Sequence, residues 1–279
     1  MSSTTRFSFA RRMLAWLVVG TICSAGTPAF AQVAGGNAYD IQAHISVAGL
    51  INLDISPIKQ VQISPQADPF ALQDQLQDWS NSNAAGSVSA GTLDSALQWV
   101  PGVSEIIVGA EATATNVAVS AVSLLGSALI EISADQVHSL TMIAGQCPSG
   151  PNGAHPSHAH GPQPNDLSDV INDLLYGNGF DTRNLLPVNN VDLPGLQVSI
   201  LGIAVPNLPL NPPPNTGINL QALGIVGATL MLNEQTTGGD GVNSMTMSTN
   251  ALHLNIDVAG LITADVTLGH ADISLLCNG

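Results

Sequence analysis

Residues 252–268 read Leu-His-Leu-Asn-Ile-Asp-Val-Ala-Gly-Leu-Ile-Thr-Ala-Asp-Val-Thr-Leu, and their apolar side chains recur at every second position. This alternation places apolar side chains on one face of an extended strand and polar ones on the other. The same pattern runs from Ile41 to Ile55 on odd positions, where we expect Gly49 to bend the strand. Beyond Gly269 the apolar set moves to odd positions, which predicts a turn or bulge between Gly269 and Asp272.

A short motif recurs at these segments. The sequence Val-Ala-Gly-Leu-Ile occupies both 47–51 and 258–262, and looser forms lie at 123–130 and 198–205. We interpret it as a strand–glycine–strand unit in which glycine lets long strands coil around a core. A chance recurrence in a chain rich in Gly, Ala and Val is the alternative. The irregular spacing does not indicate a solenoid.

Long alternating segments separated by turn-rich gaps predict a single all-β domain, either a β-sandwich or a barrel-like fold of long glycine-bent strands. Two or three short helices are expected in excursions. One begins at Asp68-Pro69 and spaces Leu72, Leu76 and Trp79 as on a helix face. The others are expected at 92–100 and from Asn165 or Asp166 to Gly177, the latter inside a Pro-, Gly- and His-rich excursion at about 148–190.

The first 31 residues have the pattern of a cleaved secretory signal peptide. Positive charges at Arg6, Arg11 and Arg12 precede an apolar stretch at 13–22, and Ala29-Phe30-Ala31 predicts cleavage before Gln32. The apolar stretch is too short to span a bilayer of ~30 Å as a helix. A twin-arginine signal at Arg11-Arg12 and lipidation at Cys23 are weaker alternatives, because the neighbouring residues match either pattern poorly.

Charge narrows the range of partners. The chain of 279 residues is 45% apolar and only 9% charged, with 5 basic and 20 acidic residues. After cleavage, Lys59 and Arg183 are the basic residues left against 20 acidic ones, a net charge of −18. A chain so poor in cations is not expected to bind nucleic acid or other polyanions. We expect no transmembrane segment in the mature chain.

Two cysteines, Cys147 and Cys277, remain after cleavage. Cysteines usually pair in an oxidising compartment, so we expect a disulfide between them. Two free buried thiols are the alternative.

Several motifs follow one another between Pro209 and Cys277, and they are Asn211–Ile218, Leu232–Gln235 with Thr236–Gly239, Asn250–Leu254 and Leu268–Asp272. This ordered set resembles the choice-of-anchor P family of exported bacterial proteins, whose members share a domain that carries different surface-anchoring signals. The segment from Ala112 to Cys147 is similar to the earlier half of that family. The resemblance implies a bacterial cell-surface or secreted β-domain without an established activity, and it supplies no catalytic residues. Asn278-Gly279 directly follows the last strand segment, so this sequence gives no basis for inferring an anchor.

Three histidines, His155, His158 and His160, form the clearest candidate metal site. Neutral imidazoles at this spacing suit zinc, copper or nickel. A Pro/Gly-rich loop offers little rigid support for catalysis, so the alternative is a solvated loop with adventitious affinity for a divalent metal and no cofactor. Trp79 and Trp99 are candidate surfaces for stacking against a carbohydrate.

Other polar residues are expected to serve structure. Glu234, His253 and His270 lie in or beside the last strand segments, where we expect them to hydrogen-bond between neighbouring strands. The stretch Gly238-Gly239-Asp240-Gly241 is like half of a calcium-binding glycine repeat but is more typical of a hairpin turn. Neither Gly-x-Ser-x-Gly nor His-Glu-x-x-His occurs in the chain.

These observations predict an exported structural or interaction protein, secreted, periplasmic or cell-surface associated, without catalytic activity. Its sheet edges favour self-association or contact with a surface polymer. The alternatives are a carbohydrate-binding module and a metal-dependent secreted hydrolase that uses the loop of His155, His158 and His160.

Overall fold

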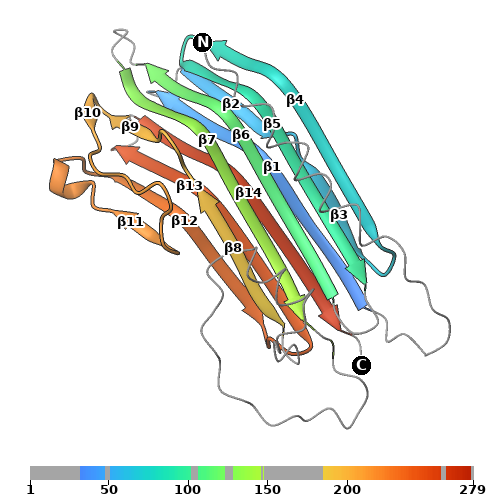
Figure 1. Ribbon diagram of the computed structural model, residues 1–279. Helices are drawn as coiled ribbons and strands as arrows, with labels where there is room; N and C mark the ends of the chain where they lie inside the picture. Colours follow the sequence, from blue (N-terminus) through green and yellow to red (C-terminus); the bar gives the residue numbers. More distant parts are fainter. Residues whose placement is uncertain are drawn as a thin grey trace, which may run out of the picture.

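Two antiparallel β-sheets packed face to face form the protein, as the computed structural model shows for residues 32–47, 51–101, 106–122, 128–145, 147, 185–258 and 262–277 (Figure 1). The predicted all-β fold is therefore confirmed in its sandwich form. Within these residues the helical content is the 3-10 turn η1 (Gln221–Leu223). No helix in the described ranges is long and apolar enough to cross a membrane.

Sheet A has the strand order β11-β12-β13-β14-β1-β2, and β3 pairs with the part of β1 that β2 leaves free. Its strands are β1 (Gln32–Val47), β2 (Ile51–Ile58), β3 (Val61–Gln66), β11 (Thr216–Ile218), β12 (Ala228–Gly239), β13 (Ser244–Val258) and β14 (Ile262–Cys277).

Sheet B has the order β10-β9-β7-β6-β5-β4, and β8 pairs with β7 beside β9. Its strands are β4 (Phe70–Asn83), β5 (Gly86–Pro101), β6 (Ile106–Val122), β7 (Ala128–Gly145), β8 (Leu186–Asp192), β9 (Gln197–Ile200) and β10 (Ile203–Ala204). β8 begins at Leu186, inside the range of about 148–190 that was predicted to form a Pro-, Gly- and His-rich excursion. The third predicted helix, from Asn165 or Asp166, lies outside the described residues.

The repeated pentapeptide joins antiparallel partners. Val47 of β1 lies opposite Ile51 of β2, and Val258 of β13 lies opposite Ile262 of β14. The chain therefore reverses direction between these residues. The prediction that Gly49 bends one continuous strand is wrong, because alternation continues through a hairpin when both of its strands bury the same face.

In each long strand, core-facing residues follow one another at a spacing of two, except at one place where the spacing is three. Buried side chains facing the core follow one another at Ala90 and Leu93 in β5, at Ala134 and Val137 in β7, and at Leu268 and Ala271 in β14. Within each sheet, the places with a spacing of three lie opposite one another on neighbouring strands. They form one line across each sheet, and we call these two lines the creases. The crease of sheet A contains Asn233, Ala251, Gly269 and Asp40, and the crease of sheet B contains Asp78, Gly91, Asn116 and Asp135.

Left-handed backbone in alternate strands produces the creases. Asn233 and Gly269 have φ of 51° and 63°, and Asp78 and Asn116 have φ of 50° and 48°. Asn, Asp and Gly are the residues that adopt this conformation most readily. β14 stays paired on both sides of Gly269, so the predicted irregularity there is a kink inside one strand rather than a turn.

The creases also explain two incorrect helix predictions. Residues 68–79 and 92–100 belong largely to strands β4 and β5. Leu76 and Trp79 flank the crease of sheet B and both pack against the core. A strand with one three-residue step places apolar residues at i, i+4 and i+7, which is also the spacing of a helix face.

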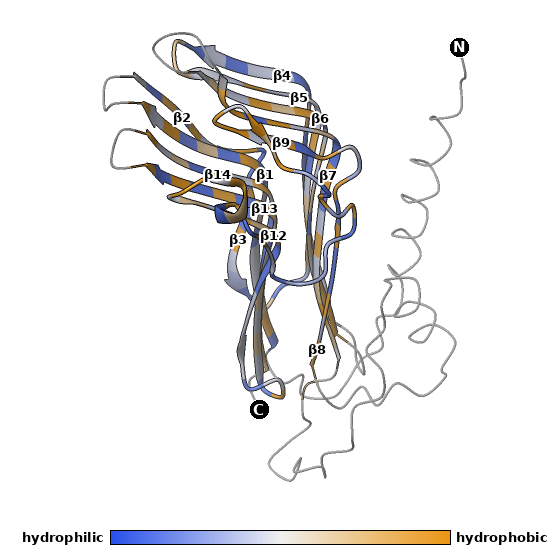
Figure 2. Cartoon of the chain, turned by 90° about the vertical axis from the view of Figure 1, so that its left-hand side faces the viewer, coloured by the Kyte–Doolittle hydropathy of each residue, from blue (hydrophilic) through white to orange (hydrophobic). Residues whose placement is uncertain are grey.

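The creases divide the interior into two apolar clusters. The larger cluster includes Ile41, Leu93 and Leu252, whereas the second includes Trp99, Ile143 and Ile273. In Figure 2 the upper halves of both sheets turn away from the lower halves in the same direction. The outer face of sheet A is therefore concave at its crease.

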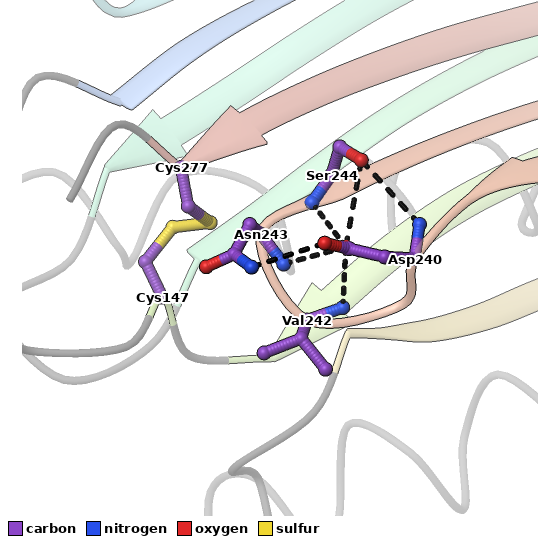
Figure 3. Close-up of a disulfide and its surroundings, with 6 residues drawn as sticks. All are labelled: Cys147, Asp240, Val242, Asn243, Ser244 and Cys277. Carbon is purple, nitrogen blue, oxygen red and sulfur yellow. Dashed lines mark hydrogen bonds between the residues drawn. A yellow bond between two sulfur atoms is a disulfide. The ribbon is translucent and has the colours of Figure 1, made fainter. Parts of the chain in front are cut away.

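A disulfide and a tight turn fasten the lower end of the sandwich. Cys147, just beyond β7, is bonded to Cys277 at the end of β14, as predicted (Figure 3). The backbone N–H of Cys277 donates to the carbonyl oxygen of Asn243 at 2.6 Å, which ties the bond to the β12–β13 hairpin.

Asp240 organises that hairpin. Its Oδ1 accepts hydrogen bonds from the backbone N–H groups of Val242, Asn243 and Ser244 at 3.0, 2.7 and 2.8 Å. These bonds, that of Val242 first, hold the pKa of the Asp240 carboxyl well below its usual range. The predicted hairpin turn is confirmed. The backbone N–H groups of the turn occupy Oδ1 of Asp240 as hydrogen-bond donors.

Candidate functional site

The concave outer face of sheet A gathers polar side chains from four adjacent strands. Because Ala38 and Ala271 point into the core, their neighbours Tyr39 and His270 point outward. Strand register places Tyr39, His270, Asn250 and Glu234 in one row directly beside the crease. We call this row, together with His253 across the crease, the crease network.

Short hydrogen bonds join the crease network. Oε2 of Glu234 accepts from Nδ2 of Asn250 and lies 2.8 Å from both this atom and Nδ1 of His253. Oδ1 of Asn250 lies 2.6 Å from Nδ1 of His270. The prediction that Glu234, His253 and His270 bond between neighbouring strands is confirmed. The network holds these half-buried side chains in fixed positions.

Tyr39 forms one wall of the network. Its ring stacks on that of His270 with centroids 4.5 Å apart, and only 8% of Tyr39 is exposed. Burial, with the nearby carboxylates of Asp265 and Asp272, raises the pKa of the Tyr39 hydroxyl to about 12. Tyr39 is therefore a neutral hydrogen-bonding group at physiological pH.

Below the crease network lies a depression of about 440 Å³, which we call the polar depression. Its floor is formed by outward residues of four strands, with Asn37, Asp272, Ser248 and Thr236 in one row. β3 forms one side through residues 62–65. Most of the lining side chains are hydroxyls and amides, so the surface can donate and accept hydrogen bonds with little net charge.

A second polar cluster lies on the outer face of sheet B. Nε2 of His138 is 3.0 Å from Oε1 of Glu111, and Nδ1 is 3.7 Å from Oδ2 of Asp192. Burial lowers the pKa of His138, but its hydrogen bonds to Asp192 and Glu111 outweigh that effect and raise the pKa to about 9. His138 is thus a charged histidine, 7% exposed, between strands β6 and β8.

Asp40 is the most deeply buried carboxyl group that the structure describes, at 0% exposure in the crease of sheet A. The Ser95 hydroxyl of sheet B donates to Oδ2 of Asp40 at 3.2 Å. Burial raises the pKa of Asp40 to about 8, and the nearby Asp94 adds to this effect. At neutral pH a protonated Asp40 therefore links the two sheets.

The predicted tryptophan surfaces do not form a shared platform. Trp99 is 1% exposed and its ring lies against Phe70 at 5.8 Å, so the prediction that it stacks on a ligand is wrong. The apolar alternation of β5 turns it into the core. Trp79 is partly buried and packs against the other apolar cluster.

The predicted metal ligands His155, His158 and His160 lie outside the described residues. Within the described ranges, no group of three or more His, Cys, Asp or Glu residues could hold a metal ion.

Comparisons of the chain with protein-family models, with curated proteins and with solved structures found no match. The resemblance to the choice-of-anchor P family thus stays a prediction.

Sequence reasoning did not find the polar depression. Apart from Asp272, its polar residues are Thr, Ser, Asn and Gln at ordinary outward positions, and only the order of the five strands brings them together. A partial signal existed in the polar runs at 233–237 of β12 and 248–250 of β13, which lie beside the crease.

Proposed function

We propose that this chain is an exported, non-enzymatic bacterial protein that self-associates along strand β4 in the secreted or cell-surface fraction. The open outer edge of β4 is the observation that carries the proposal. β4 is 14 residues long, and among the described residues it pairs with β5 alone. Exposed backbone groups on such an edge can pair with the same strand of a second copy.

The edge of sheet A that lies beside β4 is better protected. There the outermost strand is split into β2 and β3, with Lys59 at φ 55° and Gln60 between them. An edge that is broken into two short strands offers only short runs of backbone for pairing with another strand. Lys59 also donates to Oδ1 of Asp74 at 2.7 Å and so anchors β4 to sheet A without covering its outer edge.

Electrostatics sets the conditions for association. Two copies that each carry a net charge of −18 repel each other, and Asp74 and Asp78 lie on β4 itself. Added salt screens this repulsion over a distance of ~8 Å at physiological ionic strength. We therefore expect self-association to strengthen as salt is raised.

The Cys147–Cys277 disulfide supports export, because such bonds persist in oxidising compartments. Fractionation of the producing cells with thiol labelling tests this part. We expect oxidised protein outside the cytoplasm with Gln32 at its amino terminus. Reduced protein confined to the cytoplasm would contradict it.

Size-exclusion chromatography with light scattering tests self-association in Gln75→Glu and Gln42→Glu variants. Both glutamines are exposed, but Gln75 lies on the β4 edge and Gln42 on the interior strand β1. A further carboxylate beside Asp74 adds to the repulsion between two paired β4 edges. We expect Gln75→Glu to weaken association about tenfold, equivalent to ~1.4 kcal/mol, and Gln42→Glu to leave it unchanged. A strictly monomeric wild type in high salt would refute the proposal, and equal association of both variants would exclude β4.

A further inference from the structure

The polar depression lies in the angle where sheet A bends, below the crease network. Five strands contribute to it: β1, β14, β13 and β12 supply the floor, and β3 supplies a side wall. Ligand sites in proteins are concave and have volumes of roughly 300–1,000 Å³, a range that includes this depression of about 440 Å³. Shape alone does not identify a ligand, but the chemistry of the lining restricts the class of ligand that can bind.

The lining has unused hydrogen-bonding capacity. The side chains of Thr236, Thr246 and Ser248 on the floor, and of Gln62 and Ser64 on the wall, form no hydrogen bond with the part of the chain that the structure describes. Hydroxyl and amide groups both donate and accept. They face one concavity from three different strands.

The surrounding residues are held in place. Gln60 donates to Oδ1 of Asn37 at 3.0 Å, which ties the wall to the floor. Nε2 of His270 lies 3.8 Å from Oδ1 of Asp272, and His270 is itself fixed by Tyr39 and Asn250. A surface whose side chains are already ordered loses less entropy when it binds.

Charge restricts the ligand class. Asp272 is the sole ionisable residue in the lining, and its carboxylate faces His270. Lys59, the one lysine or arginine in the described ranges, is engaged with Asp74. The site therefore offers nothing to balance a phosphate, sulfate or uronate group. A ligand rich in hydroxyls and without charge complements it.

We propose that the polar depression binds a neutral glycan, whose hydroxyl groups pair with Thr236, Thr246, Ser248 and the Gln62 amide. This goes beyond the self-association proposed above and uses a different face of the molecule. It also differs from a platform built on Trp79 and Trp99, because hydrogen bonds rather than ring stacking provide the contacts.

Isothermal titration and a glycan array with the mature chain, disulfide intact, test the proposal. The panel contains neutral α- and β-linked hexose and N-acetylhexosamine oligosaccharides, their uronate counterparts, and a lysine-rich peptide. The variants are Thr236→Val and Thr246→Val, which remove a hydroxyl but keep the side-chain shape. The control is Thr229→Val, on the same strand as Thr236 but across the crease and outside the depression.

We expect wild type to bind a neutral glycan at concentrations up to about 1 mM, and each variant in the depression to bind about threefold to tenfold more weakly. The Thr229→Val control should match wild type. Failure of every neutral glycan to bind overturns the proposal. Binding that is as strong in both variants as in wild type also overturns it, and so does binding of the uronates or the basic peptide alone. Chromatography of the same samples reports self-association separately, so either proposal can fail without the other.

Discussion

Replacing Asp40 by Asn should change how the stability of this protein depends on pH. Asp40 has a pKa of about 8 in the folded chain, against 3.8 for an unperturbed aspartate. The folded state thus keeps a proton that the unfolded state loses. The Asp40 contribution to stability is greatest below pH 3.8 and declines as the pH rises toward 8, where it levels off.

The size of the effect follows from the width of that pH window. Each pH unit inside it lowers the wild-type free energy of unfolding by about 1.4 kcal/mol. Between pH 4 and pH 7 the Asn variant should therefore gain on the order of 4 kcal/mol relative to wild type. At pH 4 the two proteins should be similar, because Asn and protonated Asp both accept the hydrogen bond of Ser95.

Urea unfolding at several pH values, followed by tryptophan fluorescence, measures this difference. Asp54→Asn is the control, because the Asp54 side chain is 74% exposed on strand β2. Its unfolding free energies should run parallel to those of wild type. If the Asp40→Asn and wild-type values also ran parallel from pH 4 to pH 8, the assignment of Asp40 as a buried, protonated link between the sheets would be wrong.

Other perturbations test other features of the fold. Removing the disulfide by Cys277→Ser should cost about 5 kcal/mol, because the disulfide closes a loop of 130 residues, and denaturant titration with and without reductant measures this cost. Gly269→Ala should destabilise by about 2–3 kcal/mol, since a Cβ there adds crowding at 3.0 Å from the Ala251 Cβ to the strain of φ 63°. Gly202→Ala, with φ 76° and no atom within 4 Å, should cost only about 1 kcal/mol. Urea unfolding of both glycine variants measures these losses, and equal losses would refute the packing role of Gly269. His138 has a raised pKa of about 9, so its stabilisation is complete below pH 6.5 and is lost as the pH rises through 9. His138→Gln should therefore lose on the order of 3 kcal/mol at pH 6 and little at pH 10, and a loss independent of pH would contradict the charged pair with Glu111.

Alternation in the sequence predicted the all-β fold because one buried face per strand produces a period of two. The same reasoning failed at β4, where the step between Leu76 and Trp79 resembles helical spacing. It also misread Gly49, because two antiparallel strands that share a buried face continue one another's pattern. The errors have a common origin, since local spacing records which face is buried but not whether the chain kinks or reverses.

The site was predictable only in part. The polar residues Glu234, His253 and His270 stood out as interruptions in apolar strands, and their bonding between strands followed from that position. The concavity beside them depends on strand order. Gln62 and Thr236 are far apart in the chain, and they line the same depression only because five strands lie side by side in this order. Period-two patterns do not specify which strands are neighbours.

The creases also restrict the register in which neighbouring strands can pair. A long, regular strand rich in Ala and Val can slide by two residues against its neighbour and still bury the same face. Here a slide of two would bring the kink of one strand beside regular alternation in the next, and polar side chains on one side of the kink would then enter the core. Only one register lets Asn233, Ala251, Gly269 and Asp40 stand in line. A chain with 9% charged residues can thus fix its register by where its pattern breaks, with little need for attraction between charged side chains.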